Sequence, residues 1–369
     1  MNNSRRAIRV GANRRRRLIV ISVISSVLLI GAGGTWVTWS LYETQIRQIL
    51  GLPASDDYQG QGVEPKVSIT IEDGDFGDVI SQKLVDAGVT KSFDAVYRIL
   101  ISDASIVFTP GTYTLNSQMS ARAAIDFLRD AANRQVLTAV IPEGTVLPKT
   151  FQILSDATGI PVSEFEAAAN PADFGLPSKA PSIEGFLFPA TYEFDPADTA
   201  ETILHKMADE MTSRLDSLGV SEKDRYEVVT MAALVQREAG SNLEDFGKIA
   251  RVFQNRIDQG WKLQSDATVA YGTGNLDTVW TTDAERADES NLYNTYVHDG
   301  LPVGPIGAPG EVALEAAISP TEGDWMFFVP INLKTGETVF SVTEKEHSAA
   351  VEKLHEWCRA SEENMAYCD

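Results

Sequence analysis

Glu238 combines two surroundings that favour proton transfer by a carboxyl group. The residues one and two turns before it, Val235, Leu234 and Met231, put it on an apolar helix face, where a carboxylate loses hydration. The carboxyl end of a helix adds partial negative charge. Both effects raise the pKa of the carboxyl toward the value that a general acid needs near neutral pH. The alternative is a structural glutamate that pairs with Arg237 or caps a neighbouring group.

The elements around Glu238 are predicted to hold it on a rigid corner. Ser221 with Asp224 is typical of a capping box and Gly240 of a helix end, which predicts a helix over residues 222–239. Ser241 with Glu244 predicts a second capping box directly afterwards. The next helix has an apolar stripe formed by Phe246, Ile249, Phe253 and Ile257. Two helices therefore meet at a short turn beside the carboxyl group.

Two segments further along the chain have the composition of a sugar-binding groove. They are LQSDATVAYG at 263–272 and YNTYVHDGLPVGPIGAPG at 293–310. Aromatic rings can cover sugar faces, while amides and carboxylates bind sugar hydroxyls. From Trp261 onward, frequent Gly, Pro, Asn and Thr predict strands and ordered loops. The alternative for each segment is a structured loop without a ligand.

The N-terminal region predicts a membrane anchor. Residues 1–17 contain seven arginines and no acid, and residues 18–41 are uncharged for 24 positions, long enough to cross a hydrocarbon core of roughly 30 Å. Trp36 and Trp39 favour an uncleaved span over the alternative, a cleaved signal peptide. The arginines place the N-terminus in the cytoplasm and everything after the span outside a bacterial cell membrane. Residues 42–65 are the predicted linker.

Composition excludes several classes of protein. Without its seven N-terminal arginines the chain has a net charge near −28, because the whole chain carries −21, and such a body repels nucleic acid. No metal site is predicted, since the histidines form no H-x-x-x-H pair. No G-x-S-x-G nucleophile motif and no dinucleotide loop is found, and no cofactor is predicted. Cys358 and Cys368 either form a local disulfide in an exported tail or stay free.

The body of the chain predicts a mixed α+β fold in two parts. Residues 66–137 alternate strand and helix patterns, beginning with the half-buried strand signal of Val67, Ile69 and Ile71. Residues 138–369 form the second part. It contains the block EGFLFPATYEF at 184–194 and three consecutive helix patterns within 200–259.

Six motifs in order resemble the MltG/YceG-like family of endolytic murein transglycosylases. They are EGFLFPATY, ALVQREAG, FQNRI, LQSDATVAYG, YNTY and GLPVGPI. The resemblance implies a LysM-like module over residues 66–137, a YceG-like catalytic domain over 138–369, and Glu238 as the catalytic glutamate. The chain departs from the family at Gln236, where an earlier glutamate is common, and at Ala190, where the family has an aspartate.

The resemblance also implies a reaction. It is cleavage of the MurNAc-β-1,4-GlcNAc bond with formation of a 1,6-anhydroMurNAc end, in which the C6 hydroxyl of the sugar is the nucleophile and one glutamate serves as acid and then base. Asp266 is a candidate electrostatic helper. The other candidate groove residues are Gln264, Ser265, Tyr271, Tyr293, Asn294 and Tyr296. The implied partners are nascent peptidoglycan strands, the cytoplasmic membrane and peptidoglycan synthases.

Two other readings of the sequence stay open. A non-catalytic peptidoglycan-binding scaffold of the cell-wall synthesis machinery gives strand binding that does not depend on Glu238, and no anhydro product. A conventional glycoside hydrolase gives reducing ends, because a second carboxylate activates water or acts as nucleophile.

Overall fold

The computed structural model describes residues 55–240, 242–276 and 281–368. These residues separate into two compact units, divided between Arg134 and Gln135, and hydrophobic cores form within each unit. The basic tail, the predicted span 18–41 and the linker up to residue 54 lie outside the described residues. Among the residues that are described, no helix is both long and apolar enough to cross a membrane.

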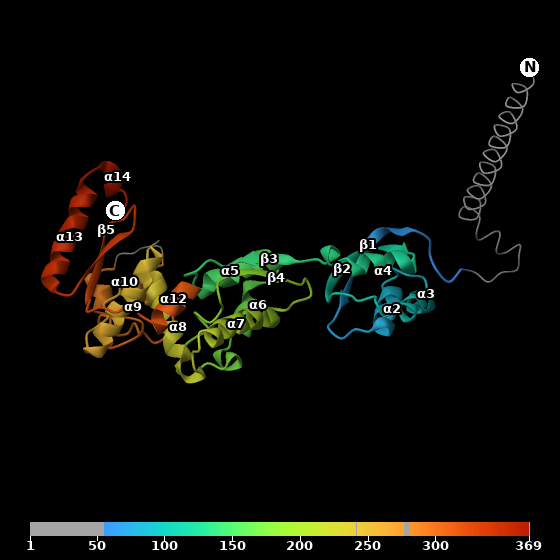
Figure 1. Cartoon of the computed structure of the whole chain (residues 1–369), viewed down its shortest axis with the longest axis horizontal. Helices are drawn as coiled ribbons and strands as arrows, with labels where there is room; N and C mark the ends of the chain where they lie inside the picture. The colour runs from blue at the N-terminus through green and yellow to red at the C-terminus, as the bar shows by residue number, and fades with distance from the viewer. Residues whose placement is uncertain (1–54, 241, 277–280, 369) are drawn as a thin grey trace, which may run out of the picture. The chain divides into compact units, whose positions relative to one another are not determined.

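The first unit is a two-stranded antiparallel sheet packed against helices (Figure 1). Its elements are β1 (Gln61–Ile71), α2 (Gly77–Asp86), α3 (Phe93–Ser102), β2 (Gly111–Met119), α4 (Ala121–Arg129) and the short 3₁₀ helix η1 (Ala131–Asn133). Strands β1 and β2 are antiparallel, with Ile69 opposite Tyr113. Alternate residues of both strands face the helices and form the core with Leu84 and Leu128. Strand β1 begins at Gln61, so it extends into the predicted linker, where it pairs with the end of β2.

The second unit begins with a small sheet packed against three helices. Its elements are β3 (Leu137–Val140), α5 (Leu147–Thr158), α6 (Val162–Ala168), η2 (Pro171–Phe174), β4 (Thr191–Phe194) and α7 (Ala200–Ser217). Strands β3 and β4 are antiparallel, with Ala139 opposite Tyr192. Phe151, Phe165 and Ile203 bring α5, α6 and α7 into one core with this sheet.

The remainder of the second unit carries Glu238. Its elements are η3 (Glu222–Asp224), α8 (Arg225–Glu238), α9 (Leu243–Asp258), α10 (Asp266–Thr273), α11 (Asp283–Arg286), α12 (Glu311–Ile318), β5 (Phe327–Asn332), β6 (Glu337–Ser341), α13 (Glu344–Arg359) and α14 (Glu362–Met365). Helices α8, α9 and α12 share a core that includes Leu234, Phe253 and Leu314. The antiparallel hairpin β5–β6 packs against α13 (Figure 1).

The predicted capping box at Ser221 has not formed, and Ser241, the predicted cap of the next helix, lies outside the described residues. Ser221 donates its hydroxyl proton to the Asp224 carboxylate, so no side chain accepts a backbone N–H there, and α8 begins only at Arg225 after a 3₁₀ turn. At α9 the cap is Asn242, whose side chain accepts the Glu244 N–H at 3.2 Å. An asparagine oxygen caps a helix as well as serine does, which explains the shift of one residue.

The prediction of strands and ordered loops after Trp261 agrees with β5, β6 and the non-helical residues 287–310, but it missed three short helices. These helices, α10, α11 and α12, all lie before β5, and α13 and α14 follow β6. Alanines at good helix-forming spacing, including Ala267, Ala270, Ala313 and Ala316, favour helix over strand. The expected mixed α+β class is nevertheless confirmed, and every described sheet is a two-stranded antiparallel pair.

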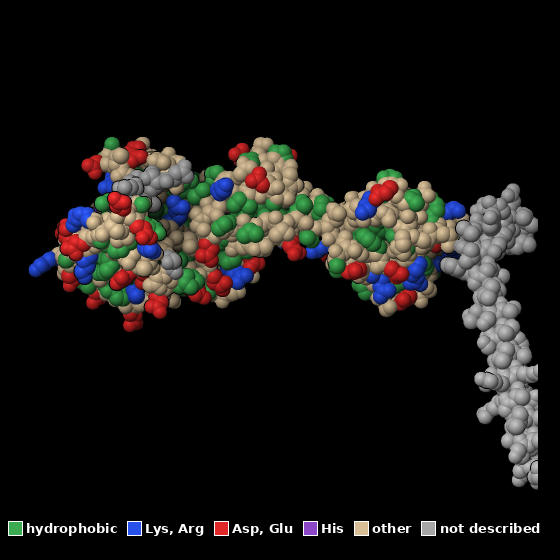
Figure 2. All heavy atoms as spheres, turned by 90° about the horizontal axis from the view of Figure 1, so that it is seen from above, with side chains coloured by type: hydrophobic (Ala, Val, Ile, Leu, Met, Phe, Trp, Pro, Cys, Tyr) green, Lys and Arg blue, Asp and Glu red, His purple; other side chains and the backbone are tan. Residues whose placement is uncertain are grey.

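The second unit has an acidic face and one disulfide. On the face of the second unit that Figure 2 shows, acidic side chains are spread widely among fewer basic ones, in keeping with the negative net charge of the chain. Cys358, in α13, and Cys368 are joined by a disulfide.

Candidate active site

Glu238 is the last residue of α8 and stands at the end of a buried helix. Leu234 and Val235 before it are fully buried, and Ala239 turns the chain into an extended conformation while its N–H bonds to the Val235 carbonyl at 2.8 Å. Glu238 itself keeps partial exposure to solvent. Desolvation of its carboxyl raises the pKa, and the charge of Asp266 raises it further. A hydrogen bond from Ser265 and the charges of Arg237 and Arg256 oppose this shift but do not reverse it.

Ser265 contacts the carboxyl group of Glu238 directly. Its hydroxyl donates to Glu238 Oε1, and its own N–H donates to Thr295 Oγ1 at 3.0 Å. Thr295 Oγ1 also lies 2.8 Å from Thr268 Oγ1, so the start of α10 is tied to the loop that contains Thr295. Within the described part of the chain no hydrogen bond reaches Glu238 Oε2. The carboxyl group therefore has one oxygen that is held and one that is available to a ligand.

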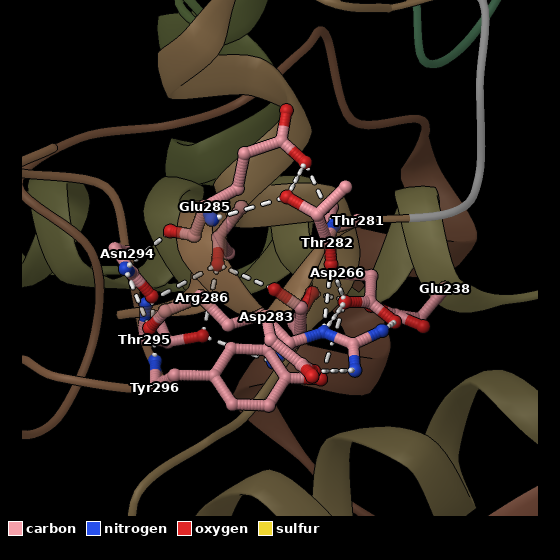
Figure 3. A network of polar contacts seen from close by, with 12 residues as sticks. Glu238, Asp266, Thr281, Thr282, Asp283, Glu285, Arg286, Asn294, Thr295 and Tyr296 are labelled. Atoms are coloured by element: carbon pink, nitrogen blue, oxygen red, sulfur yellow. Dashed lines mark hydrogen bonds and ion pairs between the residues drawn. The ribbon is translucent and has the colours of Figure 1, made fainter. Parts of the chain in front are cut away.

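Asp266 lies next to Ser265 in a cluster of donors beside Glu238 (Figure 3). Its Oδ1 accepts the hydroxyl proton of Thr281, the Nε–H of Arg286 at 3.0 Å and the hydroxyl proton of Tyr296 at 3.2 Å. The guanidinium of Arg286 also lies 5.4 Å from the centre of the Tyr296 ring. These donors fix the carboxylate of Asp266 in place. Its negative charge therefore raises the pKa of Glu238 from a constant position.

The structure brings together only some of the candidate groove residues. Ser265, Asp266 and Tyr296 lie around Glu238, and desolvation raises the pKa of Tyr296 to about 12, which keeps its hydroxyl protonated as a donor. Gln264 is exposed and has a positive φ of 52°. Tyr271 and Tyr293 contact each other edge to face, with ring centres 4.8 Å apart, and belong to a separate group around Glu184.

Asn294 does not fit the predicted groove role. Its side chain is fully buried, and its Nδ2 donates to the carbonyls of Glu285, Arg286 and Asp288 at 3.0–3.1 Å. Its Oδ1 accepts the Tyr296 N–H at 3.0 Å. Buried carbonyls and sugar hydroxyls attract the same amide group, which is why the sequence did not distinguish the two roles. Asn294 shapes the loop that presents Tyr296.

Three residues of the site were not predicted. Arg286 and Thr281 hold Asp266, and Glu184, in the block 184–194, is almost fully buried and hydrogen-bonded to Tyr271. The composition of that block was the one signal in the sequence. Gln236, where the resembling family commonly has a glutamate, accepts the Gly310 N–H at 3.0 Å through its Oε1 and so supports the loop before α12.

The geometry suits general acid chemistry. Glu238 has a raised pKa, one oxygen held by Ser265 and the other without a hydrogen bond from the described residues, so that the protonated form can present its proton to a ligand. Among the residues that the structure describes, no group of three His, Cys, Asp or Glu side chains could hold a metal ion.

Two substitutions beside Glu238 are expected to shift its pKa in opposite directions. Asp266→Asn removes a negative charge and lowers the pKa, so the alkaline limb of the activity profile moves to lower pH. Ser265→Ala removes a donor to the ionised form and raises the pKa, so that limb moves to higher pH. Each shift is on the order of one pH unit. The kcat measured between pH 4 and 9 checks both, and shifts of the same sign contradict the assignment of Glu238 as the titrating acid.

Fold and site together define an α+β protein with a protonatable glutamate held at a helix end, as in enzymes that use a general acid. Residues 69–353 match the YceG-like family, and the chain belongs to that family.

The most informative relatives carry one name. The chain is 31% identical to the endolytic murein transglycosylase of Bacillus subtilis over 309 residues, which cover 78% of this chain and 84% of that protein. It is 27% identical to the endolytic murein transglycosylase of Streptococcus pneumoniae, covering 91% of this chain and 65% of that protein. A solved YceG-like protein from Listeria monocytogenes matches with a TM-score of 0.51 and 26% identity, covering 78% of this chain and 99% of that chain.

Proposed function

We propose that this chain is an endolytic peptidoglycan lytic transglycosylase in which Glu238 acts first as general acid and then as general base. The observation that supports this most directly is the state of the Glu238 carboxyl, which has a raised pKa, one oxygen bound by Ser265 and one oxygen without a described partner. The names of the relatives from Bacillus subtilis and Streptococcus pneumoniae supply the substrate class and the type of cleavage.

In the first step, protonated Glu238 gives its proton to the oxygen of the MurNAc-β-1,4-GlcNAc bond. The bond between C1 of MurNAc and that oxygen breaks, and GlcNAc leaves with the proton as a free hydroxyl. Positive charge develops at C1 in an oxocarbenium-like state. The fixed negative charge of Asp266, together with the new carboxylate of Glu238, stabilises that charge at close range.

In the second step, the Glu238 carboxylate accepts the proton of the MurNAc C6 hydroxyl. The C6 oxygen then bonds to C1 and forms the 1,6-anhydro ring. Glu238 ends protonated, so the cycle consumes no water. Asp266 is less suited to the role of a covalent nucleophile, because Thr281, Arg286 and Tyr296 all donate to its Oδ1 and Arg286 also lies 3.4 Å from its Oδ2. The lytic reaction requires only one carboxyl group that transfers protons, whereas a conventional hydrolase requires two carboxyl groups.

The proposal places this reaction outside a bacterial cell membrane. It rests on the uncharged segment 18–41 and the arginines of residues 1–17, both of which lie outside the described residues. The first unit is proposed to be the LysM-like module that binds the strand, and peptidoglycan synthases are proposed as protein partners. Labelling of single cysteines introduced before and after the span, with a reagent that does not cross membranes, tests the orientation.

Mass analysis of the products tests the reaction itself. The full-length chain in detergent is incubated with un-crosslinked glycan strands. The proposal predicts fragments that end in 1,6-anhydroMurNAc, about 18 mass units lighter than hydrolysis products because no water is added. Products with reducing ends assign the chain to the hydrolases instead. Strand binding without any product favours a non-catalytic scaffold.

A further inference from the structure

Glu184 is a buried carboxyl that the proposed reaction does not use. Its exposure is 1%, and it follows η2 in the loop that leads to β4. Its Oε2 accepts the Leu147 N–H at 2.7 Å and the Tyr271 hydroxyl proton at 2.9 Å, and its Oε1 accepts the Gly185 N–H at 3.2 Å. Burial of a carboxyl group costs free energy, and loss of any of its three donors would leave it unpaired in the interior. Such a group therefore indicates a specific role.

The turn at Glu184 is also pressed against the helix that ends in Glu238. Gly185 has a φ of +80°, and a Cβ added there meets Pro305 Cβ at 2.4 Å and Val229 Cγ1 at 3.2 Å. Val229 belongs to α8. Only glycine fits this position, so the backbone beside Glu184 approaches α8 as closely as it can. Glu184 therefore joins the beginning of α5, through Leu147, and α10, through Tyr271, at the side of α8.

The bond to Tyr271 is one of the contacts that hold α10 in place, beside those of Ser265 and Thr268 with Thr295. Tyr271 is six residues after Ser265, and α10 is only eight residues long, so a shift of Tyr271 moves the whole helix. The beginning of that helix carries Ser265 and Asp266, the two residues that act on Glu238. We infer that Glu184 is a positioning residue of the reaction: through Tyr271 it holds α10 in the place that sets Ser265 and Asp266 against Glu238. This inference rests on the proposed function.

Protonation of Glu184 weakens the hydrogen bond by which it holds Tyr271. Desolvation raises the pKa of Glu184 to about 7, while the donors Leu147, Tyr271 and Gly185 and the charge of Arg237 oppose the shift. The titratable groups that face it are Tyr271 and Tyr293, whose hydroxyls stay neutral because desolvation raises the pKa of both, and the cationic Arg237. Above pH 7 the carboxylate makes charge-assisted bonds, which are stronger than those of the protonated form.

Paired variants test the inference in the full-length chain. Glu184→Ala removes the acceptor for Tyr271 and is expected to lower kcat about tenfold, since small displacements of catalytic groups are costly. Glu184→Gln keeps an uncharged acceptor and should recover most of that loss at pH 6, where Glu184 is itself protonated. The ratio of wild-type kcat to Glu184→Gln kcat should then grow about fivefold between pH 6 and pH 8. Asp245→Asn is the matched control, because Asp245 is a buried carboxylate of the same unit that pairs with Lys248.

If Glu184 has only a structural role, the ratio of wild-type kcat to Glu184→Gln kcat stays constant with pH, and that result overturns the inference. Folded Glu184→Ala with wild-type kcat overturns it as well. If Glu184→Ala does not fold, two other results test the inference. One is the pH dependence of the ratio of wild-type kcat to Glu184→Gln kcat, and the other is the kcat of Tyr271→Phe, which is expected to fall about tenfold.

A second measurement separates this inference from the proposed function. Glutamate labelled with ¹³C at the carboxyl carbon reports the titration of Glu238 whether or not any strand is cut. Because α10 supplies the Ser265 hydrogen bond that lowers the pKa of Glu238 more than Asp266 raises it, Tyr271→Phe should raise that pKa. An unchanged midpoint overturns the inference. Absence of anhydro products from the wild type overturns the proposed function instead.

Discussion

Glu238→Gln is expected to lower kcat by about 10²–10⁴-fold, the usual contribution of a positioned general acid. Glutamine has nearly the shape of glutamate and can still accept the Ser265 hydroxyl proton, so the start of α10 keeps its place. It cannot give up a proton to the glycosidic oxygen. Strand affinity should therefore change little while turnover collapses, and steady-state kinetics with a parallel strand-binding assay measure both quantities.

Glu227→Gln provides the control on the same helix. Glu227 lies in the first turn of α8, its side chain is exposed, and its ion pair with Lys179 is long, at 3.9 Å. Its replacement should leave kcat within a factor of about two. If Glu238→Gln folds, binds strands and still cuts them at the wild-type rate, Glu238 is not the acid.

Arg256→Met is expected to destabilise the second unit by about 3 kcal/mol. The Arg256 guanidinium, in α9, is 8% exposed and donates to the Met326 carbonyl at 2.8 Å and to the Leu263 carbonyl at 2.6 Å. Methionine fills much of the same volume but leaves both buried carbonyls without these donors. Urea unfolding followed by tryptophan fluorescence measures the loss, since Trp261 and Trp325 lie in this unit.

Arg251→Met is the matched control for burial. Arg251 is on the same helix and also donates to two carbonyls, those of Thr321 at 2.8 Å and Pro320 at 3.1 Å, but it is partly exposed. Water can replace its bonds, so the expected loss is about 1 kcal/mol. Equal losses for the two variants contradict the role given to burial at Arg256.

The sequence predicts elements well where the local pattern and the tertiary packing agree. The apolar stripe Phe246, Ile249 and Phe253 predicts the buried face of α9, and the structure confirms it. Helix starts were placed less well, because the N-cap at α9 depends on which of several polar side chains turns toward the backbone. After Trp261 the glycines and prolines suggested loops and strands, yet the alanines between them form helices.

The network behind Glu238 could not be predicted from local patterns. Glu184 and Tyr271 are 87 residues apart in sequence, and Asp266 and Arg286 are 20 apart, so no spacing rule connects them. Only the folded chain shows that these pairs meet. The error at Asn294 has another origin, since the amide that suits a sugar hydroxyl also suits the three buried carbonyls that it binds.

The most direct test of the account uses a glycan strand in which the MurNAc C6 hydroxyl is replaced by hydrogen. If Glu238 works as acid and then base on the sugar's own hydroxyl, the full-length chain binds this strand and does not cut it, while it cuts the unmodified strand to anhydro ends. Cleavage of the modified strand to reducing ends contradicts the account, because water must then be the nucleophile and a second group must activate it.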